Sequence, residues 1–349
     1  MQLTFICPEM NGNGGTETVV AKVVNHLVND NHVTLVLTSI PTNKQWLSSI
    51  NSNVDIMMVH HDGKVHKAML VIKALMKQPN DAKVIVLAAN LIKLVAKYRQ
   101  LLHRHWKLIS WIHYSLTHQP YFDPRNILVA DEHWAISSPI KDKLIEMGAD
   151  PSSVKLIFNP IDDYSGPLNQ PSNGTINLVY VGRIMFDGQK NLHELLLGIE
   201  QLKHDEKDIH LTLFGSGDDL ALCKKFAKDH GIAECLDWYG WTKDPWSVIV
   251  KQIHPQALVL TSKFEGLPMV MLEAMSRGIP CVCSDFDGYG DVLQDNVNGY
   301  VYKLGNINSL RAKMLKVLPD DLSPQKVKNS VVKFSQREYF SRLIAIIKG

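Results

Sequence analysis

The chain has 349 residues, which is enough for two α/β domains. Its hydrophobic fraction of 45% and charged fraction of 21% are ordinary for a soluble protein, and no apolar run approaches the ~18 residues of a membrane helix. The net charge is only +2 and no nucleic-acid partner is expected, while five scattered cysteines form no paired framework and no metal site, which indicates a reducing, cytoplasmic compartment.

A short apolar strand, Leu3–Cys7, opens the chain and leads through a glycine loop into a helix predicted over Thr16–Val28. This is the first unit of a Rossmann-like half-domain, and Gly14 and Gly15 would let a ligand approach the backbone at the start of the helix. The G-x-G-x-x-G pattern is missing and the next strand, His32–Thr38, ends without a ribose-binding acid, which disfavours a dinucleotide. A simple tight turn is the alternative.

Strands and helices alternate over the rest of the first 160 residues, which predicts a parallel sheet covered on both faces. The strands are expected near Val54–Val59, Lys83–Ala88, Lys107–His113, Glu132–Ile136 and Val154–Phe158. Ligands of such sheets collect at the carboxyl ends of the strands, where the segment SWIHYS places His113. A structural role for this histidine is the alternative.

Positive charge concentrates in residues 61–107, which hold ten Lys and Arg residues against two acids. Two predicted helices, Lys64–Gln78 and Leu91–His105, carry most of it. The rest of the chain is net acidic, with 27 Lys and Arg against 33 Asp and Glu once these residues are subtracted from the totals of 37 and 35. A basic amphipathic face can bind an anionic membrane surface or a phosphorylated acceptor, and a solvated helix face is the alternative.

Residues 160–174 are rich in Pro, Gly, Asn, Asp and Ser and are predicted to be a linker. A second alternating series of strands and helices follows. We therefore predict two Rossmann-like α/β domains facing across a cleft, over residues 1–160 and 161–335, and a last helix over residues 336–349 that could cross back to the first domain. The strands of the second domain are expected near Ile176–Val181, Ile209–Phe214, Cys235–Tyr239, Ala257–Thr261, Pro280–Ser284 and Gly299–Val301.

Two cations in the second half are spaced for a diphosphate. Arg183 follows a strand end and Lys190 precedes a helix, so two fixed cations seven residues apart could hold both phosphates. A pair of exposed loop cations is the alternative.

Two carboxylates further along are spaced for a polyhydroxyl ligand. Glu265 lies in a glycine turn before a helix predicted over Pro268–Arg277, and Glu273 lies inside that helix. Carboxylates accept hydrogen bonds from vicinal hydroxyls, and the start of a helix suits an anion. A surface acid and a salt-bridged helix acid are the alternative.

An Asp-x-Asp triplet, Asp285 to Asp287, resembles the metal-binding triplet of some sugar transferases. It follows a strand of the second domain, and we expect no metal site there.

Together these segments resemble the retaining glycosyltransferases of family 4, which have the two-domain GT-B fold. The matching segments are GGTE (14–17), the histidine of SWIHYS, VGR…GQKN (181–191), FGSGD (214–218) and FEGLPMVMLEAMSRGIP (264–280). Within that family HYSLTHQ, HWAISS, YGWTKDPW and LTSKFEGLPM are similar to lipopolysaccharide 1,6-galactosyltransferases. The resemblance implies retaining, metal-independent transfer of a hexose, galactose or glucose, from a UDP-sugar to a cell-surface glycan or lipid-linked acceptor, with no cofactor.

The resemblance also implies roles for residues of the second, nucleotide-sugar-binding domain. Arg183 and Lys190 would neutralise the donor diphosphate, and Glu273 would hydrogen-bond the ribose. Glu265 would hold the sugar hydroxyls together with the backbone N–H groups of Gly266, Leu267 and Met269.

In the first, acceptor-side domain the resemblance implies that Gly14 and Gly15 meet the diphosphate and that His113 contacts the sugar and the reaction centre. His113, Arg183, Lys190 and Glu265 are therefore the candidate catalytic residues. The enzyme would be cytoplasmic, and the basic residues 61–107 could attach it weakly to the inner face of the plasma membrane.

Other interpretations stay open at this point. An N-acetylhexosamine transferase or a protein glycosyltransferase would share the fold, and a nucleotide-sugar epimerase or a non-catalytic sugar-binding protein is less favoured. A non-catalytic protein would be expected to lose the acid pair or the Arg–Lys pair, and this chain has both. The poor dinucleotide fingerprint disfavours a Rossmann dehydrogenase.

Overall fold

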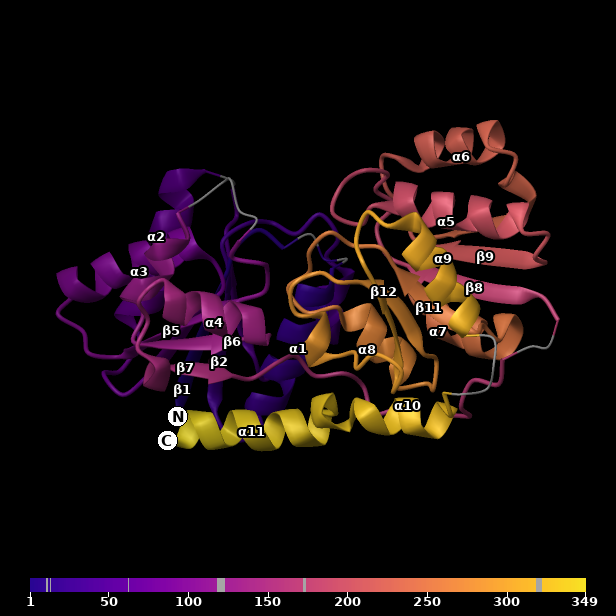
Figure 1. The fold of residues 1–349 in the computed structure, drawn as a ribbon. Coiled ribbons are helices and arrows are strands. Elements are labelled where there is room, and N and C mark those ends of the chain that lie inside the picture. Colours follow the sequence, from indigo (N-terminus) through magenta and orange to yellow (C-terminus); the bar gives the residue numbers. More distant parts are fainter. Residues whose placement is uncertain (11, 13, 62, 118–122, 172–173, 318–321) are drawn as a thin grey trace. The chain divides into compact units, whose positions relative to one another are not determined.

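The computed structural model describes residues 1–10, 12, 14–61, 63–117, 123–171, 174–317 and 322–349. The chain divides into two units, Met1–Pro160 with Tyr339–Gly349, and Ile161–Glu338. Each unit holds one parallel sheet between helices (Figure 1). Among the described residues, no helix is both long enough and apolar enough to cross a membrane.

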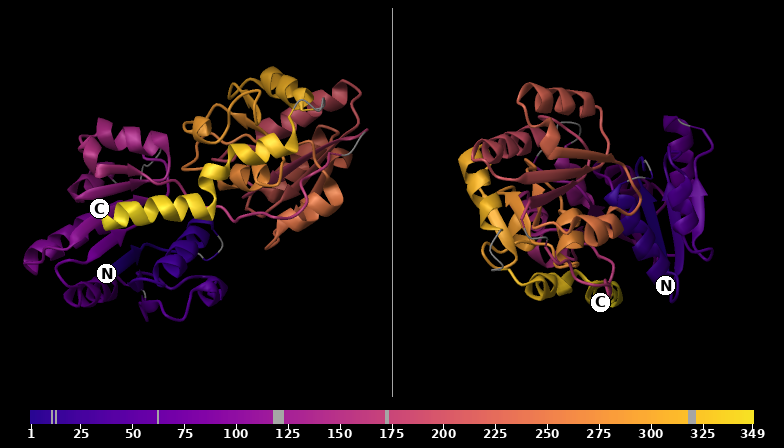
Figure 2. Two further views of the ribbon diagram at one scale, coloured as in Figure 1. Left: turned by 90° about the horizontal axis from the view of Figure 1, so that it is seen from below. Right: turned by 90° about the vertical axis from the view of Figure 1, so that its right-hand side faces the viewer.

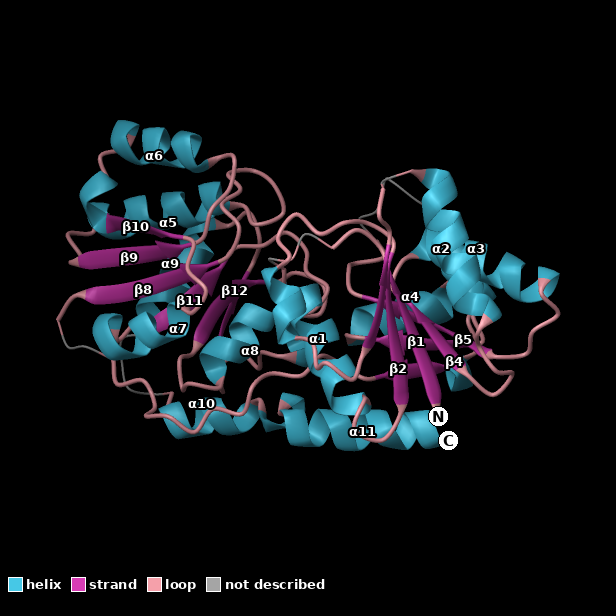
Figure 3. Cartoon of the chain, turned by 180° about the vertical axis from the view of Figure 1, so that it is seen from behind, coloured by secondary structure: helices cyan, strands magenta, loops and turns pink. Residues whose placement is uncertain are grey.

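The first unit is built on a seven-stranded parallel sheet in the order β3-β2-β1-β4-β5-β6-β7. Most of its strands are buried and largely apolar because helices cover both faces (Figure 3), while the edge strand β3 is partly exposed. The strands are β1 Gln2–Cys7, β2 His32–Leu37, β3 Asp55–Met58, β4 Lys83–Val86, β5 Lys107–Ile112, β6 Glu132–Ala135 and β7 Val154–Leu156. The helices are α1 Gly15–Leu27, α2 Lys64–Met76, α3 Ala89–Leu101 and α4 Ser138–Glu146.

The second unit is built on a six-stranded parallel sheet in the order β10-β9-β8-β11-β12-β13. The strands are β8 Ile176–Val181, β9 Ile209–Phe214, β10 Leu236–Gly240, β11 Ala257–Leu260, β12 Cys281–Ser284 and β13 Gly299–Tyr302. The helices are α5 Leu192–His204, α6 Leu220–Asp229, α7 Pro245–Val248, α8 Met269–Met275, α9 Ile307–Lys316 and α10 Pro324–Ser330.

Strand order reverses once in each sheet, at β1 in the first unit and at β8 in the second. The two strands that come next in sequence lie on one side of β1 or β8, and all later strands of that sheet lie on the other side. Ligands of open α/β sheets bind beside the carboxyl ends of the strands at such a reversal. The glycine loop follows β1, and the loop with Arg183 and Lys190 follows β8, so the fold puts the predicted segments where ligands are expected.

The predicted linker over residues 160–174 is in part a packed segment of the second unit. Asn169 is fully buried, and its side-chain amide donates to the Pro255 carbonyl over 2.8 Å. The backbone N–H of Asn169 donates to the Arg277 carbonyl over 2.9 Å, and the Arg277 guanidinium lies over the Tyr164 ring at 4.6 Å. Composition indicated a loop correctly, but it could not show that these polar groups are satisfied by the second unit.

The last helix, α11 Gln336–Lys348, begins in the second unit and ends in the first, so both chain ends belong to the first unit (Figure 2). The Gln336 amide donates to Asp162 over 2.8 Å, and the second unit ends at Glu338. Further along, the Phe340 ring stacks on His26 of α1 at 3.6 Å, and Lys83 donates to the Ile347 carbonyl.

Several predicted helix starts were wrong by one or two residues. α3 begins at Ala89 and ends at Leu101, where Leu91–His105 was predicted. α1 begins at Gly15, with Gly14 as its N-cap, and α8 covers only Met269–Met275 of the predicted Pro268–Arg277. Pro268 is the N-cap of α8, because the Met269 N–H donates to the Leu267 carbonyl over 2.9 Å and closes a tight turn before the helix.

Candidate functional site

The loop after β8 presents Arg183 to solvent on a fixed backbone. Tyr180 is fully buried at the end of β8, and its hydroxyl donates to the Arg183 carbonyl over 2.7 Å. The backbone N–H of Gly182 donates over 2.9 Å to the carbonyl of Phe214, the last residue of β9, and that of Ile184 donates over 3.0 Å to Ser216 in the loop that follows. The Arg183 side chain itself is exposed, so its guanidinium is accessible to a ligand.

The glycines of FGSGD allow the loop after β9 to pack against the Arg183 loop. A Cβ atom on Gly215, whose φ is +145°, would lie 1.8 Å from the Gly182 carbonyl oxygen. A Cβ atom on Gly217 would lie 2.0 Å from the Ile184 carbonyl oxygen. The motif therefore supports the backbone that carries Arg183.

Lys190 and Glu265 form an ion pair at the carboxyl edge of the second sheet. Lys190 Nζ lies 2.6 Å from Glu265 Oε1, and the Ser262 hydroxyl donates to the same oxygen over 2.6 Å. The Gln189 amide donates to Glu265 Oε2 over 3.4 Å and to the Phe264 carbonyl over 2.9 Å. Both partners of the pair are largely buried. The carboxylate is therefore held in one orientation by three donors.

Strand pairing explains how residues 75 positions apart meet. β8 and β11 are neighbours in the sheet, so the loops that follow them lie side by side. Thr261, directly after β11, donates through its hydroxyl to the Lys190 and Asn191 carbonyls over 3.1 and 3.0 Å. The sequence pointed to both Lys190 and Glu265 but gave no sign that they pair.

Glu273 on α8 is held by Trp246, a residue that sequence reasoning did not assign to the site. The indole N–H of Trp246 donates to Glu273 Oε2 over 3.0 Å. Arg277 donates to the Glu273 main-chain carbonyl over 2.8 Å and lies over the Trp246 ring at 5.1 Å. Burial lowers the pKa of the Arg277 guanidinium. The one sequence feature that drew attention to Trp246 was the segment YGWTKDPW, which was noted for its resemblance and not for this contact.

Gly266 and Leu267 lie in the turn between Glu265 and α8. The N–H group of Met269, predicted as a donor to a ligand, instead donates to Leu267 within that turn. The Met269 N–H would have to break its hydrogen bond with the Leu267 carbonyl before it could donate to a sugar hydroxyl.

In the first unit, Gly14 and Gly15 start α1 beside the end of β1. The Glu17 carboxylate is buried and turns back to accept a hydrogen bond from the Gly12 N–H over 2.9 Å. A Cβ atom on Gly14 would lie 2.6 Å from Glu17 Oε2. The glycine at position 14 thus leaves room for the carboxylate that binds the Gly12 N–H.

His113 follows the last residue of β5, as predicted. Its ring lies 4.4 Å from the Trp111 ring, and its Nε2 atom is shielded from solvent without a hydrogen-bond partner among the described residues. Burial lowers its pKa to about 3. The imidazole is therefore neutral near pH 7 and can exchange hydrogen bonds with a ligand without adding charge.

The Asp-x-Asp triplet is engaged within the second unit. Asp285 Oδ2 pairs with Lys303 over 2.8 Å, and Oδ1 accepts the Leu304 N–H over 2.9 Å. Asp287 is exposed. Within the described ranges, no group of three or more His, Cys, Asp or Glu side chains could hold a metal ion.

Known proteins are similar to this chain over nearly its whole length. Residues 169–334 match the family described as "Glycosyl transferases group 1". The lipopolysaccharide 1,6-galactosyltransferase of Escherichia coli K12 is 32% identical, over 99% of this chain and 98% of that protein. The structure of the lipopolysaccharide outer core galactosyltransferase WaaB is 27% identical with a TM-score of 0.86, and covers 100% of this chain and 99% of its own.

A more distant structure shares the fold alone. Anabaena Alr3699/HepE in complex with UDP is 16% identical with a TM-score of 0.80, over 100% of this chain and 99% of its own. These likenesses confirm the predicted architecture of two Rossmann-like α/β domains of the GT-B type, and the finer assignment to family 4 stays a prediction.

Proposed function

The chain belongs to the group 1 glycosyl transferases and is a glycosyltransferase, and from this membership we propose that it moves a hexose from a UDP-sugar to a glycan or lipid-linked acceptor. The observation that carries the proposal is the Lys190–Glu265 pair beside the β8 loop that presents Arg183. The pair offers a cation for a phosphate and an oriented carboxylate for hydroxyl groups at one sheet edge.

The cations account for departure of the nucleotide. When the bond between sugar and phosphate breaks, negative charge grows on the UDP oxygens and positive charge on the sugar ring. Lys190, held by Glu265, and the exposed Arg183 would stabilise the growing phosphate charge, and such electrostatic stabilisation is often the largest single contribution to catalysis. This arrangement is the basis for proposing that no metal is required. Asp285 of the Asp-x-Asp triplet is moreover already bound to Lys303 and the Leu304 N–H.

The carboxylates account for recognition of the donor. Glu265 would accept hydrogen bonds from the sugar hydroxyls and Glu273 from the ribose. Ser262, Gln189 and Lys190 already orient the first carboxylate, and Trp246 orients the second. Little ordering would then be needed when the donor binds.

We propose that the configuration at the anomeric carbon is retained. In the proposed step the bond from the anomeric carbon to the phosphate oxygen breaks, and an acceptor hydroxyl oxygen bonds to the same face. The hydroxyl proton passes to the departing phosphate. The contribution of the first unit stays a prediction, in which Gly14 and Gly15 meet the diphosphate and the neutral His113 meets the sugar.

We favour galactose as the sugar and a lipopolysaccharide outer-core glycan as the acceptor, because the chain is similar over its length to a lipopolysaccharide 1,6-galactosyltransferase and to a lipopolysaccharide outer core galactosyltransferase. A cytoplasmic enzyme with such an acceptor would work at the inner face of the membrane, with weak attachment through residues 61–107. An N-acetylhexosamine donor or a protein acceptor remains compatible with the fold.

A panel of UDP-sugars tests the proposal. UDP-galactose or UDP-glucose should bind the purified chain and be hydrolysed slowly without acceptor, whereas UDP-N-acetylhexosamines should bind more weakly. Products separate the alternatives, because an epimerase would release a different intact UDP-sugar. Absence of binding by every member of the panel would contradict the proposal.

A further inference from the structure

Helix α2 carries an apolar stripe on its exposed side. Val65, Met69 and Met76 are 57–69% exposed, and their spacing of four and seven residues puts them on one face of the helix. The opposite face is buried in the first unit through Val71, Ala74 and Leu75. An ordinary surface helix is apolar only on its core side, so the outer stripe has no role in packing this unit.

The helices around the stripe are basic and contain no acid. The charged residues of α2 and α3 are all cations, namely Lys64, Lys67, Lys73, Lys93, Lys97 and Arg99, and Lys77 directly follows α2. Leu101 at the end of α3 is 72% exposed. The Arg104 guanidinium donates to the Met76 carbonyl over 3.3 Å, so the segment that follows α3 contacts the end of α2.

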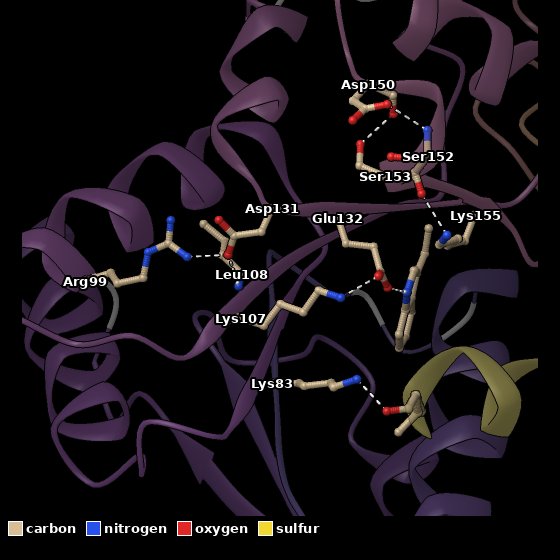
Figure 4. Close-up of polar contacts among 12 residues, drawn as sticks. Lys83, Arg99, Lys107, Leu108, Asp131, Glu132, Asp150, Ser152, Ser153 and Lys155 are labelled. Carbon is tan, nitrogen blue, oxygen red and sulfur yellow. Dashed lines mark hydrogen bonds and ion pairs between the residues drawn. The ribbon is translucent and has the colours of Figure 1, made fainter. Parts of the chain in front are cut away.

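A basic hollow of about 400 Å³ lies next to these helix ends, lined by Arg99, Arg104, His105, Lys107 and Asp131. Figure 4 shows its polar contacts: Arg99 pairs with Asp131, which also accepts the Leu108 N–H over 2.7 Å, and Lys107 pairs with Glu132 over 2.6 Å. Three cations therefore line the hollow with one carboxylate.

The hollow is separate from the predicted ligand edge of this sheet. Lys107 and Glu132 are the first residues of β5 and β6, so the hollow lies at the amino ends of the strands. Gly14, Gly15 and His113 lie at the carboxyl ends. The cations of the hollow are therefore not part of the donor site proposed above.

We propose that α2 and the end of α3 dock on an anionic phospholipid bilayer, with Val65, Met69, Met76 and Leu101 entering the interface and a headgroup phosphate occupying the hollow beside Arg104. Apolar residues flanked by lysines fit a bilayer, in which anionic headgroups cover apolar acyl chains. A groove on a partner protein would not require this excess of cations. The inference deepens the attachment proposed for residues 61–107 and rests on the proposed function, since a lipid-linked acceptor brings the enzyme to a membrane.

Vesicle sedimentation tests the stripe. The full chain should bind vesicles of phosphatidylglycerol and phosphatidylcholine in 50 mM salt, and bind phosphatidylcholine vesicles at least about tenfold more weakly. The variant Val65→Ser/Met69→Ser/Met76→Ser should lose about tenfold or more in partition. A matched variant of half-exposed apolar residues of the second unit, Leu222→Ser/Val297→Ser/Val332→Ser, should bind like the wild type. Wild-type protein left in the supernatant, or equal loss in both variants, would overturn the proposal.

The hollow is tested by Arg104→Gln against Lys224→Gln, an exposed cation of α6. The first should weaken vesicle binding several-fold and the second should leave it unchanged. If inorganic phosphate binds the chain at Arg104 and vesicles do not bind, the ligand of the hollow is a soluble phosphate. That result would refute the proposed membrane docking. UDP binding, measured on the same proteins, should be equal in all of them. Vesicle binding without UDP binding would refute the proposed function and leave the docking surface standing.

Discussion

Lys190 and Glu265 show most clearly what single residues contribute. Each was expected to bind the donor by itself, and the structure adds that they bind each other at 2.6 Å. The residue types and their positions after strands could be predicted from the sequence. Their contact could not, because it depends on the pairing of β8 with β11, and Ser262 and Trp246 were missed because a serine or tryptophan acting on another side chain leaves no local pattern.

The variant Lys190→Ala should weaken UDP binding and lower turnover by roughly ten- to a hundredfold, because a charge-assisted hydrogen bond contributes about 1.5–3 kcal/mol. Calorimetric titration with UDP and initial rates measure both effects. Lys251→Ala, which removes an exposed cation of the same unit, should change neither. Equal behaviour of the two variants would show that the Lys190–Glu265 pair is only structural.

His113 should remain neutral in mildly acidic solution, because its pKa is lowered to about 3. The folded state then binds fewer protons than the unfolded state between pH 3 and about 6.5, so its contribution to stability is complete above pH 6.5 and falls as the pH drops, by up to about 1.4 kcal/mol per pH unit. Imidazole resonances in an NMR titration report the protonation directly. A His113 signal that titrates near pH 6.5 would contradict the burial described here.

At the scale of elements, β8 and β9 have the predicted bounds, because each is a mostly apolar strand that is followed directly by a glycine. Helix α8 is shorter than predicted, since the Leu267–Met269 turn uses the residues before it. Residues 160–174 differ most from expectation, because the buried amide of Asn169 is satisfied by distant carbonyl groups that composition does not reveal. Local patterns thus predict where elements lie, while their ends depend on tertiary contacts.

The substitution Gly217→Ala tests the coupling of the loops after β8 and β9. Its new Cβ atom would meet the Ile184 carbonyl oxygen at 2.0 Å, so one loop must move, at a cost of about 1–3 kcal/mol. We expect a lower thermal midpoint for the second unit and weaker UDP binding. Gly290→Ala, where no heavy atom lies within 4 Å of the added Cβ, should be neutral. A Gly217→Ala protein with wild-type stability and affinity would show that the close approach is unimportant.

At the scale of the whole molecule, alternation of strands and helices predicted two Rossmann-like α/β domains, and the density of matching segments in the second half predicted the enzyme class. The exposed stripe of α2 was not predicted, because the sequence of this helix was considered only for its positive charge. Exposure of Val65, Met69 and Met76 is a property of how the helix is rotated on the sheet, which periodicity alone did not determine.

The central claim is that this chain transfers a hexose from a UDP-sugar with cations of its own. The most direct measurement is transfer of labelled galactose from UDP-galactose to a lipopolysaccharide core acceptor in excess EDTA, by wild-type protein and by Arg183→Ala. The account predicts label on the acceptor without added metal, and a rate at least about tenfold lower for the variant. Label that stays in UDP-galactose, or transfer that requires manganese and is indifferent to Arg183, would contradict it.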